Sequence, residues 1–257
     1  MDLSKIKMVV TDLDGTYLKN DKTISDYTKE VIVKLRNSGC LFVVATARPV
    51  RAVKQFLPYV EFDLGIFHKG AVIFGKNQEV MRFSIDNPYD LICKIRKDKP
   101  EACIAVETND TLYANFHAER IWKGIEYIST DDFRELQEAK ADKIIIEADS
   151  LEKVKEFEGY LTDDLYVELS ENTVAMIMNR QAGKMRAILL LAEKYGISPD
   201  EIIAFGDDHN DREMLIGCGM GIAVSNALDV IRECADEICG SNEEDGVARW
   251  INNHLFD

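Results

Sequence analysis

Short runs of consecutive apolar residues alternate with segments of helical periodicity in the first part of the chain. Residues 5–14 (KIKMVVTDLD) and 41–47 (LFVVATA) are such runs, and they predict buried strands. Between them, Ser25 precedes a segment whose apolar residues recur at helical spacing, and Gly39 follows it. Serine favours the start of a helix and glycine its end. This helix is expected to face inward with Tyr27, Val31 and Leu35.

The same alternation continues after residue 47 and resumes near the C-terminus. A helix is expected near residues 48–59 and a strand around 63–70, followed much later by a helix over 184–197 and by strands over 201–208, 220–224 and 236–240. Continuous apolar strands that alternate with amphipathic helices are typical of a parallel sheet covered on both faces. The predicted fold class is therefore α/β, with a Rossmann-like doubly wound parallel sheet as its core.

Between about 80 and 180 the strands carry more polar residues. The segments 102–110 and 111–117 read as a hairpin joined through Asn109 and Asp110. Further strands are expected over 143–149, 165–171 and 173–179, with a helix over 150–161.

These elements predict a second domain inserted into the first. The catalytic core would comprise residues 1–80 and 181–257, and residues 81–180 would form an inserted, smaller α+β cap domain. Insertion at a surface loop is tolerated because the ends of an inserted domain usually lie close together. The alternative is one very large mixed sheet that runs through the whole chain.

Composition narrows the range of partners. The 257 residues carry a formal net charge of -15, which would repel a nucleic acid backbone. The same charge would repel a phosphorylated small molecule unless cations reverse the field locally. The N-terminus lacks a leader pattern and no run of eighteen apolar residues occurs, so a cytoplasmic protein without a membrane partner is expected. The oligomeric state stays open: no coiled-coil heptads are visible, and a monomer and a weak homodimer would both fit.

The six cysteines show no CxxC spacing and read as reduced thiols in the core; they are Cys40, Cys93, Cys103, Cys218, Cys234 and Cys239. A zinc site is the alternative. It finds no support in the four histidines, which have no ligand spacing relative to the cysteines; they are His68, His117, His209 and His254.

Two carboxylates end the first predicted strand, in the stretch MVVTDLDGTYL. Asp12 and Asp14 are two residues apart, so both can face the same way at the carboxyl end of the strand, where open α/β sheets build their sites. Two adjacent carboxylates are costly unless a cation lies between them or one holds a proton. Gly15 and Thr16 then permit a tight, hydrogen-bonded turn. In isolation, this stretch would be interpreted as a surface turn.

Three further features stand at the ends of predicted elements. Thr46 ends a strand, and its hydroxyl could bind an anion. Lys184 begins a helix, where the helix dipole favours anions, so a lysine there would gain from an anionic partner. A third group of acidic residues follows another strand and offers oxygen ligands of the kind a hard divalent cation prefers: Asp207, Asp208 and Asp211. Each feature alone could be an ordinary surface residue, but the ordered set indicates a site.

The ordered set resembles the haloacid dehalogenase-like (HAD) superfamily of phosphohydrolases, and more closely its Cof-type branch, which has an inserted type IIB α/β cap. DLDGTYL matches the first motif, TAR the second, Lys184 the third and GDDHNDREML the fourth. SNALDVIRECAD and SNEEDGVARWI match further stretches typical of the branch. The resemblance covers nearly the whole chain.

The resemblance implies a role for each motif residue. Asp12 would be the nucleophile that forms an aspartyl-phosphate, and Asp14 the general acid and base. Thr46 and Lys184 would bind the phosphoryl oxygens, with Arg48 and Asn210 as further substrate-binding residues. The implied cofactor is Mg²⁺, held by Asp12, the main-chain carbonyl of Asp14 and Asp207, with support from Asp211 and from Asp208.

Three positions depart from the usual pattern of the branch. Ala47 replaces the glycine of the second motif, and Met185 replaces the glycine that follows the lysine of the third. Lys69 stands where asparagine is usual; its charge could reach the phosphate or the cap, or remain in solvent. None of these changes removes a catalytic group.

The leaving group is the least defined part of the reaction. Candidate cap contacts cluster in one stretch: Tyr113, Asn115, His117, Arg120 and Trp122. They could equally be the core and rim of the cap. The resemblance implies a small phosphorylated metabolite, such as a sugar phosphate or pyridoxal phosphate. Two alternatives to an Mg²⁺-dependent phosphatase stay open: a phosphomutase of the phosphomannomutase type and a non-catalytic binding protein on the same scaffold.

Overall fold

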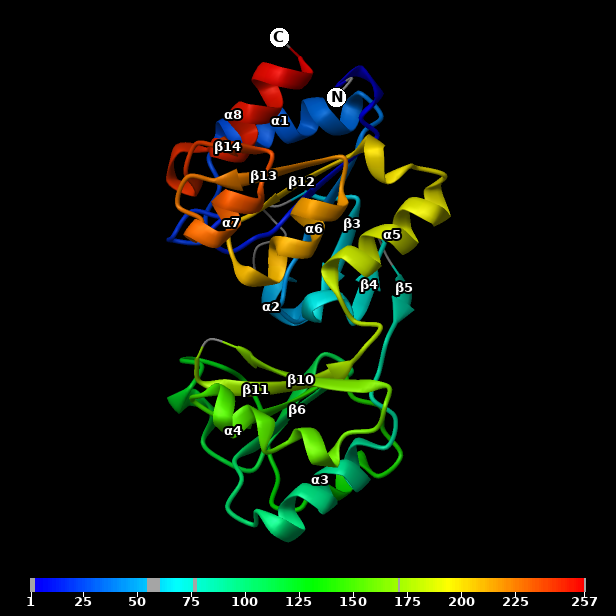
Figure 1. The fold of residues 1–257 in the computed structure, drawn as a ribbon, viewed down its shortest axis with the longest axis vertical. Coiled ribbons are helices and arrows are strands. Elements are labelled where there is room, and N and C mark those ends of the chain that lie inside the picture. The colour runs from blue at the N-terminus through cyan, green and yellow to red at the C-terminus, as the bar shows by residue number, and fades with distance from the viewer. Residues whose placement is uncertain (1–2, 55–60, 76–77, 171, 257) are drawn as a thin grey trace. The chain divides into compact units, whose positions relative to one another are not determined.

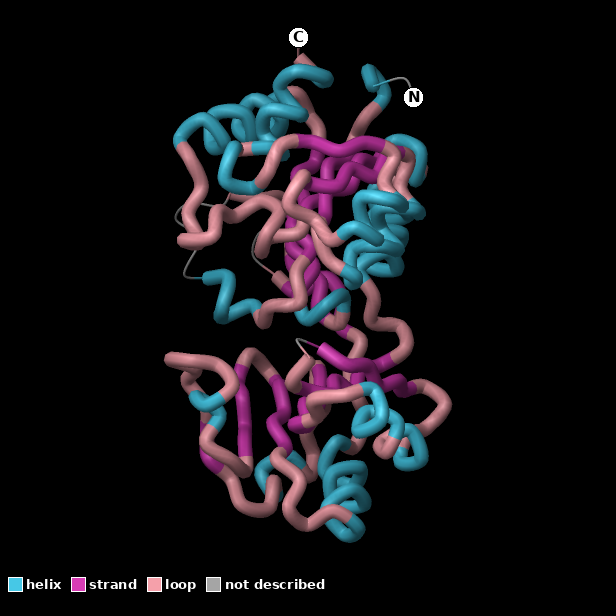
Figure 2. The backbone as a smooth tube through the Cα atoms, turned by 60° about the vertical axis from the view of Figure 1, so that its left-hand side comes forward, coloured by secondary structure: helices cyan, strands magenta, loops and turns pink. Residues whose placement is uncertain are grey.

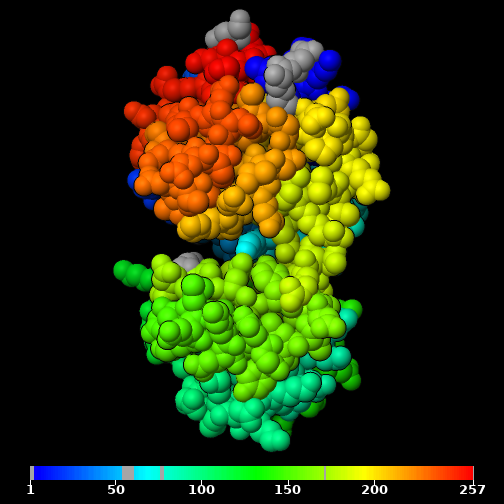
Figure 3. Space-filling view, viewed as in Figure 1, coloured from blue at the N-terminus to red at the C-terminus, as the bar shows by residue number. Residues whose placement is uncertain are grey.

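A computed structural model describes residues 3–54, 61–75, 78–170 and 172–256. The chain divides into two compact units, of which the first combines residues 1–81 with 183–257 and the second comprises 82–182. In Figure 1 the first unit contains the blue and the yellow-to-red parts of the chain, and the second is mostly green. The space-filling view shows N-terminal residues beside residues from the C-terminal part within the first unit (Figure 3). Below, the first is called the core unit and the second the cap unit.

An eight-stranded sheet forms the centre of the core unit, in the order β14-β13-β12-β1-β2-β3-β4-β5. Its strands are β1 (Met8–Thr11), β2 (Leu41–Ala45), β3 (Leu64–Phe67), β4 (Val72–Phe74), β5 (Glu79–Arg82), β12 (Ile202–Gly206), β13 (Met220–Val224) and β14 (Glu237–Cys239). The six strands from β14 to β3 pair in parallel, and β4 pairs with β3 in antiparallel orientation. The sheet therefore confirms the predicted parallel α/β core, with an antiparallel edge that the sequence had not indicated.

Helices cover both faces of this sheet (Figure 2). They are α1 (Asp26–Asn37), α2 (Val50–Lys54), α5 (Lys184–Tyr195), α6 (Arg212–Gly217), α7 (Asp229–Cys234) and α8 (Gly246–Leu255). Helix α1 packs against α8, and α5 packs against α6. The helix expected near 48–59 corresponds to α2, and residues 55–60 lie outside the described residues. No helix in the described ranges combines the length and the apolar character that a membrane span requires.

Helix α1 begins as predicted, because the Ser25 side chain accepts a hydrogen bond of 3.0 Å from the backbone N–H of Thr28. The predicted inward position of Tyr27 is wrong: 36% of this residue is exposed. Val31 and Leu35 are buried as predicted, and Thr28 and Ile32 complete the buried stripe. At a helical period of 3.6 residues, Tyr27 lies at the edge of this stripe, where its ring packs beneath the Arg249 guanidinium.

The cap unit holds a six-stranded sheet in the order β10-β11-β9-β6-β7-β8. Its strands are β6 (Ile104–Thr108), β7 (Thr111–Ala114), β8 (Ile128–Ser129), β9 (Lys143–Glu147), β10 (Leu165–Ser170) and β11 (Val174–Asn179). All pairs are antiparallel except β7 with β8. The predicted hairpin is present, and both turn residues have positive φ, 48° for Asn109 and 62° for Asp110. Asparagine and aspartate tolerate this conformation better than most residues.

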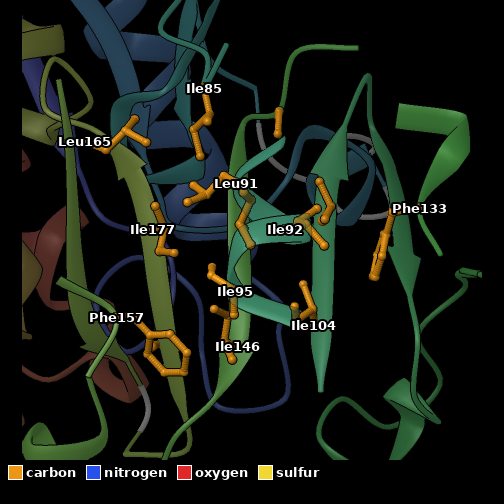
Figure 4. Packing of buried hydrophobic residues seen from close by; sticks show 14 of the residues in the cluster. Ile85, Leu91, Ile92, Ile95, Ile104, Phe133, Ile146, Phe157, Leu165 and Ile177 are labelled. Carbon is orange, nitrogen blue, oxygen red and sulfur yellow. The ribbon is translucent and has the colours of Figure 1, made fainter. Parts of the chain in front are cut away.

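The cap unit has its own hydrophobic core (Figure 4). Helix α3 (Pro88–Asp98) contributes Leu91, Ile92 and Ile95, and the sheet contributes residues from alternate positions such as Ile104, Ile146 and Ile177. The expected helix over 150–161 ends early, as α4 (Leu151–Lys155), and continues as a 3-10 turn over Glu158–Tyr160. Phe157 from this junction lies in the same cluster.

The cysteines are free thiols in the described structure. Three are buried as predicted, and burial raises the pKa of Cys40, Cys218 and Cys239 to about 12 in each case. The prediction that all six lie in the core is wrong, because Cys93 is exposed and Cys103 and Cys234 are half-buried. Cys93 belongs to the polar side of α3, which the apolar residues of that helix leave in solvent.

Candidate active site

The carboxyl ends of three neighbouring strands bring the predicted site residues together. Asp12 follows β1, Thr46 follows β2 and Asp207 follows β12, and these strands are adjacent in the order β12-β1-β2. Because the strands are parallel, their carboxyl ends meet at one edge of the sheet. The backbone N–H of Asp12 donates to Phe205 O at 3.0 Å, which extends the pairing of β1 with β12 to the site.

Lys184, the first residue of α5, lies at the centre of a buried ion-pair group. Its Nζ is 2.6 Å from Asp12 Oδ1 and 2.6 Å from Asp211 Oδ1, and only 1% of its side chain is exposed. Burial alone would lower the pKa of Lys184, but the two carboxylates outweigh it and hold the pKa above its ordinary value. The lysine is therefore charged, and the alternative of a surface lysine is excluded.

Burial raises the pKa of Asp12 well above its ordinary value, against the attraction of Lys184. The charges of Asp211 and Asp207 act in the same direction as burial. The carboxyl of Asp12 thus lies in a region of surplus negative charge, which a bound cation would relieve.

Three carboxylates form this surplus. Asp12, Asp207 and Asp211 each place an oxygen within 4.8 Å of those of the other two, and Lys184 supplies one opposing charge. Burial raises the pKa of Asp207 to about 6, and the charges of Asp211 and Asp208 add to the shift, while a hydrogen bond from Thr16 Oγ1 at 2.5 Å opposes it. Oxygen ligands with excess negative charge suit a hard divalent cation. The residues present therefore fit Mg²⁺.

The turn after β1 is shaped around this group. Gly15 has a φ of +79°, and a Cβ at this position would lie 2.4 Å from Asp207 Oδ2. Only glycine accommodates both the backbone conformation and the approach of the carboxylate.

Asp211 supports the loop that carries Asp207. Its Oδ2 accepts hydrogen bonds from the backbone N–H groups of Asp207 at 3.0 Å and Asp208 at 3.1 Å, while its Oδ1 meets Lys184. Asp208 is exposed, and its carboxylate accepts a hydrogen bond of 2.7 Å from the backbone N–H of His209. The structure therefore brings Asp211 into the carboxylate group and places Asp208 in a capping position outside it.

The electrostatic surroundings of Asp207 lead to a testable pH dependence. With a pKa of about 6 in the folded state, Asp207 favours folding when protonated, so its contribution is present below about pH 4 and is lost as the pH rises through 6. Asp207→Asn is therefore expected to raise the free energy of unfolding of the metal-free protein by about 3 kcal/mol at pH 7, and by little at pH 4. Urea unfolding of both proteins in EDTA measures this difference, and a difference independent of pH would contradict the explanation.

Asp14 has surroundings of the opposite sign. Arg48 donates from Nε to Oδ2 at 2.5 Å and from Nη2 to Oδ1 at 2.7 Å, and Lys22 Nζ lies 2.7 Å from Oδ1. Burial would raise the pKa of Asp14, but these contacts outweigh it and lower the pKa below its ordinary value. Two aspartates two residues apart are thus set in contrasting environments, as two carboxylates with different roles require.

Lys22 was not among the residues that the sequence singled out. It belongs to no motif of the ordered set, and its contact with Asp14 depends on how the chain turns after β1. The sequence could not have revealed this contact from spacing, because a surface lysine in a polar turn is an ordinary occurrence.

Thr46 is buried and offers a hydroxyl at the same edge of the sheet. Its Oγ1 accepts a hydrogen bond of 3.1 Å from the backbone N–H of Arg48, which leaves the hydroxyl proton available as a donor. Asn210 lies in the 3-10 turn over His209–Asp211, where its Oδ1 is buried without a hydrogen-bond partner in the described structure. Lys69 is half-buried in a left-handed conformation with φ 57°, and its N–H donates to Thr46 O at 3.0 Å.

Each candidate cap residue makes contacts within the cap unit. Both polar groups of the Asn115 side chain form hydrogen bonds with the backbone: Oδ1 accepts from Ile104 N at 2.7 Å, and Nδ2 donates to Ala102 O at 2.9 Å. Tyr113 packs against the hydrophobic cluster. Arg120 pairs with Glu147 at 2.5 Å, and His117 Nδ1 lies 3.2 Å from Tyr127 Oη. The backbone N–H of Trp122 donates to Ala118 O at 3.0 Å.

Comparison with known proteins places this geometry in context. The model of the haloacid dehalogenase-like hydrolase family matches residues 9–251. A 5-amino-6-(5-phospho-D-ribitylamino)uracil phosphatase of Bacillus subtilis (strain 168), YitU, is 29% identical over 269 residues, which cover 98% of each chain. A second 5-amino-6-(5-phospho-D-ribitylamino)uracil phosphatase of the same organism, YcsE, is 25% identical over 258 residues, which cover 98% of this chain and 96% of that one.

Solved structures share the fold over nearly the whole chain. A protein from Eubacterium rectale superposes with a TM-score of 0.87 at 26% identity, covering 97% of this chain and 99% of that one. A haloacid dehalogenase-like hydrolase from Bacteroides thetaiotaomicron superposes with a TM-score of 0.82 at 24% identity, covering 96% and 99%.

Proposed function

The chain belongs to the haloacid dehalogenase-like hydrolase family, and on this premise we propose that it is an Mg²⁺-dependent phosphatase of small phosphate monoesters that acts through an aspartyl-phosphate on Asp12. The observation that carries the proposal is the buried group in which Lys184 lies between Asp12 and Asp211, with Asp207 alongside. A buried carboxylate with surplus negative charge and a fixed ammonium beside it are the parts that phosphoryl transfer to an aspartate requires.

The first step joins the Asp12 carboxylate to phosphorus. A carboxylate oxygen attacks the phosphoryl group, the bond from phosphorus to the ester oxygen breaks, and Asp14 gives a proton to the departing alcohol. Lys184, Thr46 and Asn210 would bind the equatorial phosphoryl oxygens and stabilise the charge that they carry.

The second step regenerates the enzyme. A water molecule attacks the phosphorus of the aspartyl-phosphate while Asp14 takes its proton, and the bond between Asp12 and phosphorus breaks to release inorganic phosphate. Asp14 is ionised when its carboxylate accepts hydrogen bonds from Arg48 and Lys22, which is the form that this second step needs. The first step needs the protonated form, so at least one of the two cations has to leave Asp14 when substrate binds.

Arg48 is the cation with a second proposed partner. As a substrate-binding residue, its planar guanidinium would turn from Asp14 to a phosphoryl oxygen, for which its donor geometry is equally suited. The same movement would remove the two Arg48 hydrogen bonds that stabilise the ionised form of Asp14.

The carboxylate group would hold the metal. Asp12, Asp207 and the main-chain carbonyl of Asp14 would be ligands, with Asp211 in support through Lys184 and the backbone of Asp207. When bound, Mg²⁺ would neutralise charge between the carboxylates and the phosphoryl group.

The proposed substrates are small phosphorylated metabolites of the cytoplasm, such as sugar phosphates. Two Bacillus subtilis relatives are named as phosphatases of 5-amino-6-(5-phospho-D-ribitylamino)uracil, whose phosphate is carried by a sugar-like chain. The cap unit would supply the contacts to the leaving group, as the expected specificity domain. The protein would act as a monomer or a weak homodimer.

Phosphate release from a panel of esters tests the proposal. The panel contains p-nitrophenyl phosphate, several sugar phosphates, pyridoxal phosphate and 5-amino-6-(5-phospho-D-ribitylamino)uracil, each assayed with Mg²⁺ or with EDTA. Release is expected with Mg²⁺, and loss in EDTA should be reversed by added Mg²⁺. If folded protein releases no phosphate but converts a hexose 1-phosphate to its 6-phosphate, the phosphomutase alternative is correct. If it does neither, the proposal is wrong and a binding role follows.

A further inference from the structure

Two cationic side chains, Lys22 and Arg48, donate hydrogen bonds to the single carboxylate of Asp14. Its Oδ1 meets both Lys22 Nζ and Arg48 Nη2 at 2.7 Å, and its Oδ2 meets Arg48 Nε at 2.5 Å. About a third of the Asp14 side chain is exposed (35%), so packing alone leaves its carboxyl free to rotate. The three hydrogen bonds therefore define its orientation.

The turn that carries Lys22 has a strained backbone and is held by local hydrogen bonds. Lys22 has a φ of 67°, in the left-handed region that a lysine rarely adopts. Its N–H donates to Lys19 O at 2.8 Å, and the Asp21 carboxylate accepts from the N–H of Thr23 at 3.0 Å and from its hydroxyl at 2.6 Å. Strain of this kind persists when the surrounding contacts impose it, and it recurs at functional sites.

Two distant loops of the core unit anchor this turn. Buried Asn242 donates from Nδ2 to Leu18 O at 2.9 Å, and the backbone N–H of Asn20 donates to Glu243 Oε1 at 2.7 Å. Asn226 links the two sides, because its Nδ2 donates to Gly15 O at 2.7 Å and its Oδ1 accepts from Asn242 N at 3.0 Å. The backbone of the turn that carries Lys22 is thus held by the loops that follow β13 and β14.

We propose that Lys22 is a positioning residue for the acid and base carboxyl of Asp14. The inference rests on the proposed phosphatase function, in which Arg48 serves the phosphoryl group. A guanidinium that turns to the substrate gives up Asp14, and Lys22 is then the cation that keeps the Asp14 carboxyl in place for proton transfer to the leaving alcohol.

Two esters with different leaving groups test this role. The p-nitrophenolate leaving group needs little protonation, whereas the alkoxide of glycerol 1-phosphate needs a proton as it departs. Lys22→Asn is the informative variant, since asparagine tolerates the left-handed conformation and lacks the ammonium. It is expected to lower kcat/KM for glycerol 1-phosphate by about tenfold or more, and for p-nitrophenyl phosphate by about threefold or less. Lys22→Arg, which restores a cation, is expected to recover most of the loss.

Lys19→Asn is the matched control, because Lys19 belongs to the same turn and its Nζ lies 3.8 Å from Asp245 rather than on Asp14. Lys19→Asn should leave the ratio of kcat/KM for the two esters at the wild-type value. A purely structural role for Lys22 would lower kcat/KM equally for both esters. An unchanged ratio of the two kcat/KM values in Lys22→Asn would therefore overturn the proposal. Wild-type protein that releases phosphate from neither ester would instead overturn the proposed function, and the positioning role with it.

Discussion

Asp12→Asn is expected to abolish phosphate release, with a loss of about 10⁴-fold or more in kcat. The amide is nearly the same size as the carboxylate but is a far weaker nucleophile, so no aspartyl-phosphate can form. Initial rates with p-nitrophenyl phosphate and saturating Mg²⁺ measure the loss. This ester is the stringent choice because its leaving group needs little help from Asp14.

The fold of this variant should survive the change. Lys184 keeps its contact with Asp211 at 2.6 Å, and the substitution removes a carboxylate whose ionisation burial opposes. The free energy of unfolding is therefore expected to stay within about 1 kcal/mol of wild type. Asp200→Asn, at an exposed residue of the 3-10 turn over Pro199–Glu201, is the matched control and should retain full activity. Activity within tenfold of wild type in folded Asp12→Asn would show that Asp12 is not the nucleophile.

Lys184→Met is expected to have the largest effect on stability. Methionine fills the space of the lysine stem but leaves Asp12 and Asp211 buried without their opposing charge. Removal of one partner from a buried ion pair typically costs about 3–5 kcal/mol, and a cost in this range is expected for the metal-free protein. Urea unfolding in EDTA measures it. Activity should fall as well, because the phosphoryl oxygens lose a cation.

A second substitution separates charge from packing. In Lys184→Met combined with Asp211→Asn, the uncompensated carboxylate is removed, while the asparagine oxygen can still accept from the backbone N–H groups of Asp207 and Asp208. The double variant should therefore be more stable than Lys184→Met alone, with a favourable coupling energy between the two sites. A loss below about 1 kcal/mol in the single variant, or no recovery in the double, would show that the ion pairs do not stabilise the core unit.

Hydrophobic pattern was enough to locate the parallel strands of the core. Strands such as β1 and β12 are buried on both faces, so they read as uninterrupted apolar runs whose ends can be seen in the sequence. Asp12, Thr46 and Asp207 stand directly after such runs, and strand pairing alone therefore places them together. Lys184 could be placed at a helix start, but its complete burial could not be predicted from periodicity.

What the sequence did not reveal depends on contacts between distant segments. The bond from Asn226 to Gly15 O spans 211 residues, and the bond from Asn242 to Leu18 O spans 224. Each asparagine by itself is a typical loop residue. Lys22 could not be singled out for the same reason, because its contact with Asp14 depends on a turn that these bonds hold.

The cap was predicted less completely than the core. Its strands alternate polar and apolar residues, so their existence was visible, but the role of individual polar residues was not. Asn115 was a candidate for substrate contact, yet both of its polar groups hold the backbone beside β6. Helix α4 ends before the predicted helix does, and Phe157, two residues beyond its last residue, lies in the hydrophobic cluster of the cap.

Trapping the phosphorylated enzyme tests the central claim most directly. Asp14→Asn, mixed with p-nitrophenyl phosphate and Mg²⁺ and quenched in acid, should accumulate the intermediate because the water-activating carboxylate is absent while the leaving group needs no proton. Lys7 and Lys19 bound a tryptic peptide that reads MVVTDLDGTYLK in the wild type and has asparagine in place of Asp14 in the variant, and fragmentation of this peptide locates the phosphoryl group on a single residue. The account predicts one added phosphoryl group on Asp12, removed by hydroxylamine. Nitrophenol release by this variant without any covalent phosphate on the peptide, or with phosphate on another residue, would contradict it.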